Sequence, residues 1–216
     1  MSDPIRDNAR ERMKKFCRVC PECNGRACAG EVPGMGGLGT GASFRNNYDA
    51  LAAVTLNMTA LHDVKEPDPS TTVLGMKLSV PALAAPIGGA GFNMCPDESE
   101  DVYIDAVLGG CAAAGTMGCT GDGVPPYIIE AARKAISAHS GIPFIKPWEG
   151  AELKEKLDYV IALNPPAIGM DVDAAGLVTL RKMGRPVTPM GVAELTEVCS
   201  YLHEKGQKFI VKGIMT

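Results

Sequence analysis

The sequence lacks the features that mark membrane, secreted and nucleic-acid-binding proteins. No apolar run approaches the length of a membrane-spanning helix, and residues 1–6 carry no apolar core of a signal peptide. Basic residues are not in excess: the formal net charge is −4, whereas nucleic-acid-binding domains are usually basic. We therefore expect a cytoplasmic protein with no nucleic-acid partner and no membrane contact.

Histidine is scarce, with only three in 216 residues, but cysteine is not, with eight. In a cytoplasmic chain so many cysteines indicate thiols or metal ligands before disulfides. A hydrophobic content of 46% and a charged content of 21% are typical of a globular protein. A chain of this length can hold one substantial domain and a smaller appendage.

Three segments follow one another along the chain. Residues 1–42 are rich in cysteine and glycine, and a short exposed helix is expected before the first cysteine. Residues 43–79 contain a pre-barrel helix and a lead-in in which Pro67 and Pro69 exclude a long helix. Residues 80–216 alternate short apolar runs with amphipathic helices, and we expect them to form an incomplete β/α barrel.

The alternation predicts five strands and four helices. The strands are expected over residues 81–86, 115–119, 142–146, 167–172 and 208–214, and the helices over 97–114, 126–137, 151–163 and 189–205, the last opened by Thr188 as N-cap. Such a series indicates a parallel sheet with right-handed crossovers. Small residues at the strand ends favour an α/β fold of the TIM (β/α)8 barrel class, of which this chain supplies about the first five strands. An open doubly wound sheet fits the same pattern.

The last expected strand carries Lys212 among apolar residues. A lysine is costly to bury without a partner, so Lys212 is predicted to be a site residue at the C-terminal end of a strand, where such barrels keep their chemistry. A series of this kind closes at eight strands. We therefore expect half of the site to lie outside this sequence, and the open sheet edge to make the chain a homo-oligomer.

Several segments resemble the FMN-dependent α-hydroxy acid dehydrogenase/oxidase family, which includes glycolate oxidase and lactate oxidase. The matching segments are Ser43–Asn47, Ser70–Lys77, Val80–Gly88, Ala114–Thr116 and Phe209–Thr216. The resemblance covers roughly residues 43–216 in register. It implies a TIM barrel that binds FMN at its C-terminal mouth, oxidises a small 2-hydroxy acid or a related substrate, and passes electrons to an acceptor.

The resemblance also implies roles for single residues. Pro86, Ile87 and Gly88 would lie against the flavin ring, largely through backbone groups. Thr120 would occupy the position of a small hydroxyl residue near the ring, and Lys146 would touch the pyrimidine side of the flavin, where the family usually has glutamine.

One further match and two departures concern the same site. Lys212 matches the family's lysine near flavin N1 and would be the catalytic residue, since a fixed ammonium stabilises negative charge on the reduced ring. Trp148 stands about where the family has a substrate-binding tyrosine. Asp171 stands near a position that is usually threonine, which would place a carboxylate close to the cofactor.

The general base of the family, a histidine on a later strand, has no match here. His62 precedes the expected barrel, whereas His139 and His203 follow helices and would lie at the face opposite the active site. The phosphate site, which such barrels build after the seventh and eighth strands, has no match either.

A cluster of four cysteines is the most specific local motif. Cys17, Cys20, Cys23 and Cys28 have the spacing of ligands that wrap one tetrahedral ion or an iron–sulfur cluster. The motif predicts metal binding, with zinc and a [4Fe-4S] cluster equally compatible; the alternative is a loop of reduced thiols.

Three weaker patterns remain open. Gly34, Gly36 and Gly39 match a dinucleotide fingerprint, but no strand precedes them and no helix follows at once, so we interpret the match as chance. Cys119, at the end of an expected strand, is either a redox thiol or a small core residue. Asp122 is either a site acid or a turn residue.

These patterns favour an FMN-dependent oxidoreductase. The alternatives are a metal- or FMN-binding barrel fragment without hydroxy-acid oxidation, a fragment that is inert alone, and a non-redox FMN isomerase on the same barrel.

Overall fold

The structure is a computed structural model that describes residues 3–13, 16–31, 37, 39–185 and 187–214. Contacts divide the chain into two compact units. One comprises residues 1–68 and 91–97, and the other comprises residues 69–90 and 98–216. In the described ranges, no helix is both long and apolar enough to cross a membrane.

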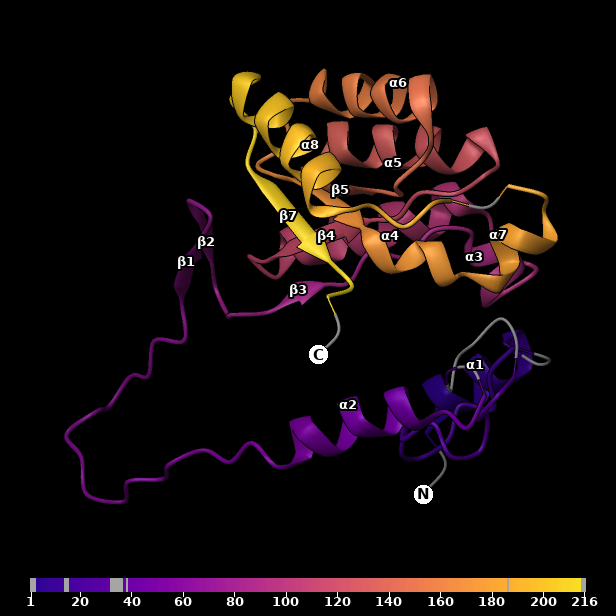
Figure 1. Ribbon diagram of the computed structural model, residues 1–216. Coiled ribbons are helices and arrows are strands. Elements are labelled where there is room, and N and C mark those ends of the chain that lie inside the picture. The colour runs from indigo at the N-terminus through magenta and orange to yellow at the C-terminus, as the bar shows by residue number, and fades with distance from the viewer. Residues whose placement is uncertain (1–2, 14–15, 32–36, 38, 186, 215–216) are drawn as a thin grey trace. The chain divides into compact units, whose positions relative to one another are not determined.

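The first unit contains the helices α1 (Pro4–Arg12) and α2 (Ala42–Ala52) (Figure 1). The cysteine-containing segment, residues 16–31, has neither helix nor strand. Arg6 and Arg10 of α1 donate hydrogen bonds to two backbone carbonyls of this segment at 3.0 and 3.1 Å. These bonds tie the irregular segment to α1.

The second unit is built on a parallel sheet whose strand order follows the chain, β3-β4-β5-β6-β7. The strands are β3 (Leu83–Ala84), β4 (Met117–Thr120), β5 (Ile142–Ile145), β6 (Ile168–Asp171) and β7 (Phe209–Lys212). An antiparallel hairpin, β1 (Thr71–Val73) and β2 (Met76–Leu78), precedes them. A doubly wound sheet reverses its strand order, whereas a barrel wall does not. The predicted partial TIM barrel is therefore confirmed.

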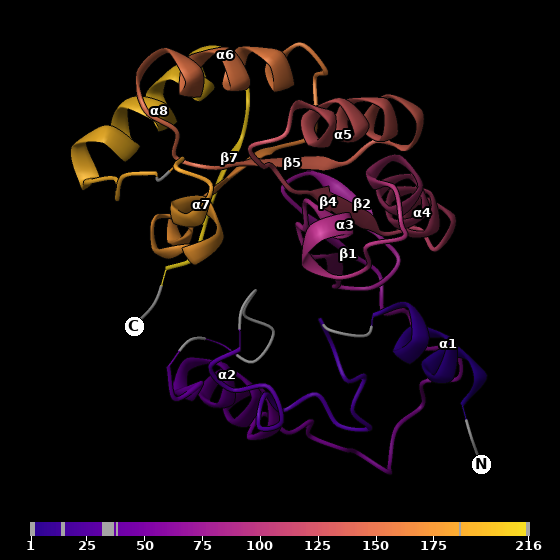
Figure 2. The ribbon, with the colours of Figure 1, turned by 90° about the vertical axis from the view of Figure 1, so that its right-hand side faces the viewer.

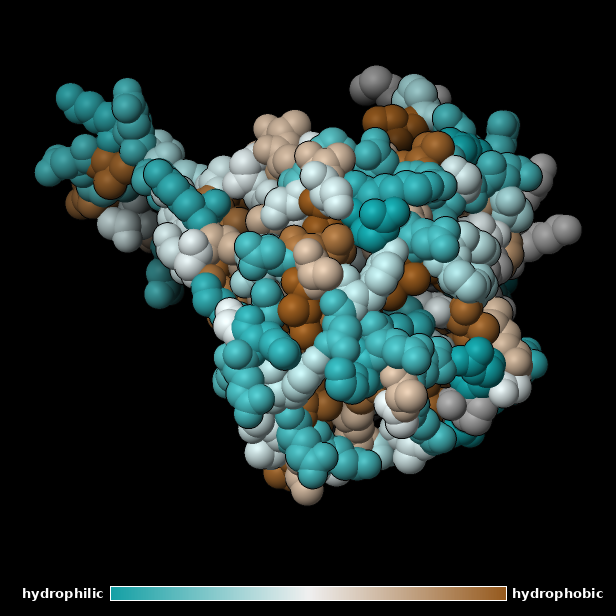
Figure 3. Space-filling view, turned by 90° about the horizontal axis from the view of Figure 1, so that it is seen from above, coloured by the Kyte–Doolittle hydropathy of each residue, from teal (hydrophilic) through white to brown (hydrophobic). Residues whose placement is uncertain are grey.

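Helices fill the connections between the strands. The longer ones are α4 (Glu100–Ala113), α5 (Pro126–His139), α6 (Gly150–Ile161) and α8 (Val192–Glu204), and the shorter ones are α3 (Ala90–Asn93), a 3-10 helix (Val172–Gly176) and α7 (Val178–Lys182). Figure 2 shows α4, α5, α6 and α8 in an arc around the strands. Hydrophilic residues predominate on the face seen from above α5, α6 and α8 (Figure 3), as amphipathic helices require when they bury one side.

The sheet has a buried cluster on each face, because successive side chains of a strand point to opposite sides. On one face, Phe144 packs with Cys119 and with Leu78 of the hairpin. On the other face, Ile145 packs with apolar residues of α6 and α8, among them Leu157. A third cluster joins α4 to α5. The helices cover the Ile145 face, so side chains on the Phe144 face point toward the interior of the barrel. We call this the interior face.

The start of α8 differs from the sequence prediction. Thr188 was expected to be the N-cap, but the helix is capped at Gly191, where Glu194 accepts a hydrogen bond from the backbone N–H at 2.7 Å. The Thr188 hydroxyl instead bonds to the Glu149 carboxylate. The predicted start was wrong because a tertiary contact engages Thr188, while Glu194 supplies half of a capping box further along.

Candidate functional site

Polar side chains collect where the parallel strands end. The carboxyl ends of parallel strands meet at one edge of a sheet, and this edge carries Thr120 on β4, Lys146 directly after β5, Asp171 on β6 and Lys212 on β7. The strand register pairs Asp171 with Lys212. The structure thus brings these four predicted residues to the same edge.

Lys212 forms ion pairs with two carboxylates. Its Nζ donates to Asp171 Oδ1 at 2.5 Å and lies 3.5 Å from Asp173 Oδ1. Burial alone would lower the pKa of Lys212, but the hydrogen bond and charge of Asp171, with a smaller contribution from Asp173, raise it above its usual value. The ammonium is therefore held in its charged form.

The expected burial of Lys212 was wrong, because its side chain is 38% exposed. In the described part of the chain, β7 is the last strand of the sheet and has a neighbour on one side only. The expectation that the Lys212 ammonium needs a partner still holds, and Asp171 is that partner.

Lys146 is far more enclosed, with 9% of its surface exposed. Its Nζ donates to the Asp122 backbone carbonyl at 2.6 Å, and its position two residues after Phe144 places it on the interior face. Burial lowers the pKa of Lys146, against the raising effect of the charges on Asp122 and Asp171. The carboxyl edge of the sheet thus carries two amines, Lys146 in a buried environment and Lys212 in a partly exposed one.

The Asp122 side chain is fully buried and accepts four hydrogen bonds. Oδ1 accepts from the Gly123 N–H at 2.7 Å and from Lys156 Nζ at 2.7 Å. Oδ2 accepts from the Lys146 N–H at 3.2 Å and from Trp148 Nε1 at 2.5 Å. Asp122 is therefore more than a turn residue: it links the end of β4, the end of β5 and helix α6.

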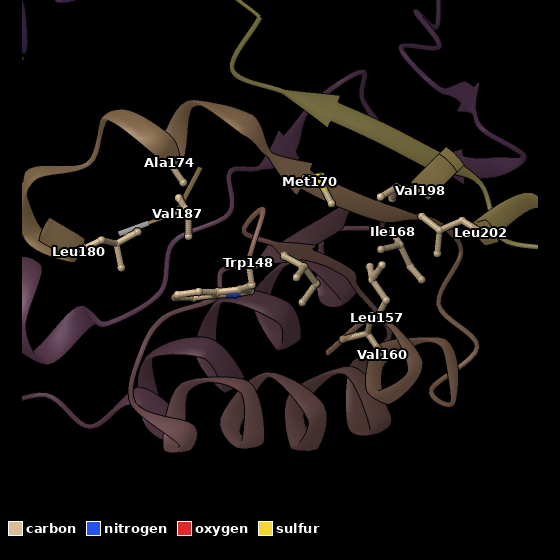
Figure 4. Close-up of a cluster of buried hydrophobic side chains, with 11 residues drawn as sticks. Trp148, Leu157, Val160, Ile168, Met170, Ala174, Leu180, Val187, Val198 and Leu202 are labelled. Carbon is tan, nitrogen blue, oxygen red and sulfur yellow. The ribbon is translucent and has the colours of Figure 1, made fainter. Parts of the chain in front are cut away.

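Trp148 is turned into the cluster between the sheet and the helices. The residue is 3% exposed, and its ring lies among the side chains labelled in Figure 4, including Leu157 and Val160 of α6. Lys156 Nζ lies 4.2 Å from the ring centroid, a cation–π contact. Because the indole N–H is used by Asp122, the Trp148 side chain is a packing element of this wall.

The segment 86–88 lies directly against the end of β4. Gly121 N–H donates to the Ile87 carbonyl at 3.3 Å, and a Cβ at Gly121 would lie 2.4 Å from the nitrogen of Gly88. Only glycine fits at such a close approach. The buried carboxylate of Glu100 accepts hydrogen bonds from the two backbone N–H groups that follow, at 3.0 and 2.8 Å. The backbone predicted to contact the flavin is thus held at Ile87 and directly after Gly88.

Thr120 and Cys119 occupy opposite faces of β4. Cys119 packs on the interior face with Phe144, so alternation directs Thr120 toward the helices. The Thr120 hydroxyl is buried and has no hydrogen-bond partner among the described residues; its contact with the flavin stays a prediction. Burial, with the charge of Cys111, raises the pKa of the Cys119 thiol to about 11, which favours the core interpretation over a redox thiol.

The structure does not support the metal site predicted at Cys17, Cys20, Cys23 and Cys28. All four are described as free thiols. Within the ranges that the structure describes, no group of three or more Cys, His, Asp or Glu residues is placed to hold a metal ion. The segment is organised instead by Arg18, which pairs with Glu31 at 2.6 and 2.8 Å.

The glycine fingerprint lies mostly outside the described residues. Gly34 and Gly36 are not described, and Gly39 is the only glycine of the motif that is.

Two charged residues of the site were not predicted from the sequence. Asp173 lies two positions after Asp171, in the 3-10 helix that follows β6, where the alternation of a strand no longer holds. Lys156 lies on α6, and nothing in its local sequence signals a buried partner 34 residues earlier.

Comparisons with known proteins agree with this fold. A family model described as FMN-dependent dehydrogenase matches residues 34–182. A solved lactate oxidase structure from Pediococcus acidilactici is similar with a TM-score of 0.66 and 17% identity, over 98% of this chain and 59% of that chain. A double variant of flavocytochrome b2 with sulfite bound is similar with a TM-score of 0.56 and 21% identity, over 79% of this chain and 45% of that chain. No curated protein matches the sequence.

The chain spans about half the length of these two structures, 59% of one and 45% of the other. Likeness at this level of identity shows the fold, a partial TIM barrel. The family model covers most of the sequence and includes the ends of β3 to β6. This chain therefore belongs to the FMN-dependent dehydrogenase family.

Proposed function

We propose that this chain forms the flavin-binding wall of an FMN-dependent oxidoreductase that acts on a small 2-hydroxy acid or a related substrate and passes electrons to an acceptor. The observation that carries the proposal is the convergence of Lys212, Lys146 and the backbone of residues 86–88 at one edge of the sheet. Cytoplasmic location and a homo-oligomeric state stay predictions from the sequence.

The residues at this edge fit the flavin part of FMN. The isoalloxazine ring presents carbonyl oxygens and ring nitrogens, which accept hydrogen bonds from ammonium groups. Lys146 would bind the pyrimidine side, and the glycine-lined segment 86–88 would lie against the ring. Bound FMN would supply the acceptor for the electron pair of the substrate. Lys212, held charged by Asp171, would be the catalytic residue because its ammonium stabilises negative charge that develops nearby.

The test is a titration of FMN with the purified chain, followed by the quenching of flavin fluorescence and by the visible spectrum after dialysis. We expect binding that Lys212→Met weakens by roughly tenfold, the effect of one charge-assisted hydrogen bond. Lys134→Met, which removes an exposed ammonium on α5, is the matched control and should bind as the wild type does. Absence of FMN binding by the wild-type chain would overturn the proposal.

A second candidate follows from Trp148. Its N–H is buried and bonded to Asp122, so this strand offers no aromatic hydrogen-bond donor to a substrate. That arrangement favours an FMN-binding wall without hydroxy-acid oxidation, or a non-redox FMN isomerase. Anaerobic addition of glycolate or lactate to the FMN-loaded protein tests the first candidate against the second: bleaching of the flavin supports the oxidoreductase and rules out the second candidate.

A further inference from the structure

The Asp122 carboxylate has its hydrogen-bonding capacity filled. An ionised carboxylate offers about four acceptor sites and no donor. Two of the four donors come from residues 146 and 148, just after β5, one from Lys156 on α6, and one from the adjacent Gly123. No surface of the side chain is exposed to water. All four acceptor sites of the carboxylate are thus occupied by donors of the protein.

One ammonium forms a direct ion pair with this buried carboxylate. Lys156, with a side chain 15% exposed, forms an ion pair with Asp122 at 2.7 Å. The same ammonium also donates to the Gly123 carbonyl at 3.2 Å. Lys156 therefore holds the carboxylate in place from the helix side, which leaves Oδ2 aimed at the end of β5.

Asp122 Oδ2 accepts hydrogen bonds from two residues whose side chains lie on opposite faces of the wall. It accepts from the Lys146 backbone N–H while the Asp122 carbonyl accepts from Lys146 Nζ, so Lys146 is held at two points. It also accepts from the Trp148 indole, and a turn in which Trp148 N–H donates to the Lys146 carbonyl at 2.8 Å joins the two residues.

We propose that Asp122 is a positioning residue, which fixes the Lys146 ammonium on the interior face of the wall and holds the Trp148 ring on the helix side. The proposal rests on the proposed function in one respect: the ligand that Lys146 would meet is the flavin. Asp122 itself touches no ligand in this scheme. As a result, the segment after β5 presents the Lys146 ammonium to the site, and the Trp148 ring stays on the helix side.

The test compares two double variants that differ only in the acceptor at position 122. Asp122→Leu with Lys156→Met removes the ion pair and the acceptor together, so neither partner of that pair is left buried alone. Asp122→Asn with Lys156→Met removes the same charges but keeps an amide oxygen for the Lys146 and Trp148 donors. Its NH2 group takes the place of Oδ1, so the Gly123 N–H loses its acceptor in both variants alike. Net charge is identical in the two proteins, and circular dichroism checks the fold of both.

Two measurements report positions without any need for FMN. Trp148 is the only tryptophan in the chain, so its emission maximum and its quenching by acrylamide report the burial of this ring. Acetylation of Lys146 by a limiting amount of acetic anhydride, read by mass spectrometry against the exposed Lys134, reports access to its amine. In the leucine variant we expect red-shifted emission and roughly tenfold faster acetylation, the effect of one lost buried hydrogen bond. The asparagine variant should resemble the wild type in both.

Equal behaviour of the two double variants would overturn the proposal. Loss of the fold in the leucine variant would overturn it as well, because Asp122 would then hold the sheet together instead of placing two side chains. FMN titration is a separate arm, in which the leucine variant should bind more weakly than the asparagine variant. If the wild type binds no FMN, the proposed function fails, while fluorescence and acetylation still decide the role of Asp122.

Discussion

Lys212 and Asp171 face each other on adjacent parallel strands, with 2.5 Å between Nζ and Oδ1. The pair places a carboxylate beside the cation that would stabilise charge on a reduced flavin. Asp171 raises the pKa of Lys212 by its hydrogen bond and charge, against the lowering effect of burial. The ammonium is thus secured in its charged form, but part of its field is cancelled by its partner.

Replacing Asp171 should make bound FMN easier to reduce. In Asp171→Thr the negative charge is gone and the field of Lys212 is less cancelled, so we expect the midpoint potential to rise by about 30 mV, which corresponds to ~1.4 kcal/mol for two electrons. Redox titration of the FMN-loaded protein against reference dyes measures this shift. Asp173→Asn is the control, and because its carboxylate lies farther away, at 3.5 Å, the shift should be smaller. An unchanged or lower potential in Asp171→Thr would contradict the expectation.

Gly213, which follows Lys212, should not tolerate a side chain. Its φ is +91°, and a Cβ would lie 2.5 Å from Asp173 Oδ1. Gly213→Ala should therefore lose about 1–2 kcal/mol of unfolding free energy from the left-handed backbone, and more from the contact with Asp173. Gly184→Ala is the matched control, since φ is +65° there and a Cβ would meet nothing within 4 Å. Thermal unfolding of both variants measures the difference, and equal melting temperatures would count against the predicted contact.

The burial of Cys119 should make stability depend on alkaline pH. Its pKa is raised by burial to about 11, above the ordinary thiol value of about 8.5 in the unfolded chain. The folded state therefore keeps the proton longer, so the stabilisation is complete below the unfolded pKa and is lost as pH rises through the folded one. Urea unfolding between pH 8 and pH 11 should show the wild type losing stability relative to Cys119→Ala. A constant difference across this range would be inconsistent with the buried thiol.

The N-terminal cysteines should be dispensable for flavin binding, because every residue proposed to hold FMN belongs to the second unit. We expect a variant with serine at positions 17, 20, 23 and 28 to bind FMN with the affinity of the wild type. Elemental analysis of the wild-type protein for zinc and iron tests the original metal prediction directly. Weaker FMN binding by the serine variant would show that the first unit contributes to the site.

Much of the barrel wall could be predicted from the sequence. The strand that ends at Ile145 was expected because a short apolar run precedes an amphipathic helix, and parallel strands place their carboxyl ends at one edge. Lys212 was expected at this edge as a lysine on a buried strand, whereas Lys146 and Asp171 were assigned to the site by the family resemblance. The short helix α7 was not expected, because a five-residue helix gives too little periodicity to recognise.

The partners of the charged groups could not be predicted. Asp122 follows a strand like any turn residue, and its four donors include groups 24, 26 and 34 residues away. Trp148 would have faced the interior if the strand had continued, but the chain turns after Lys146 and the ring enters the helix-side cluster.

By itself, the sequence determined the order of strands and helices and the parallel sheet, whose strand ends carry Lys146, Asp171 and Lys212. These follow from local periodicity, which is a property of neighbouring positions in the chain. Only the tertiary structure decided that Lys212 pairs with Asp171, that Lys146 is clamped by Asp122, and that Trp148 leaves the interior face. Such pairings depend on strand register and on burial, which are set by contacts between distant segments.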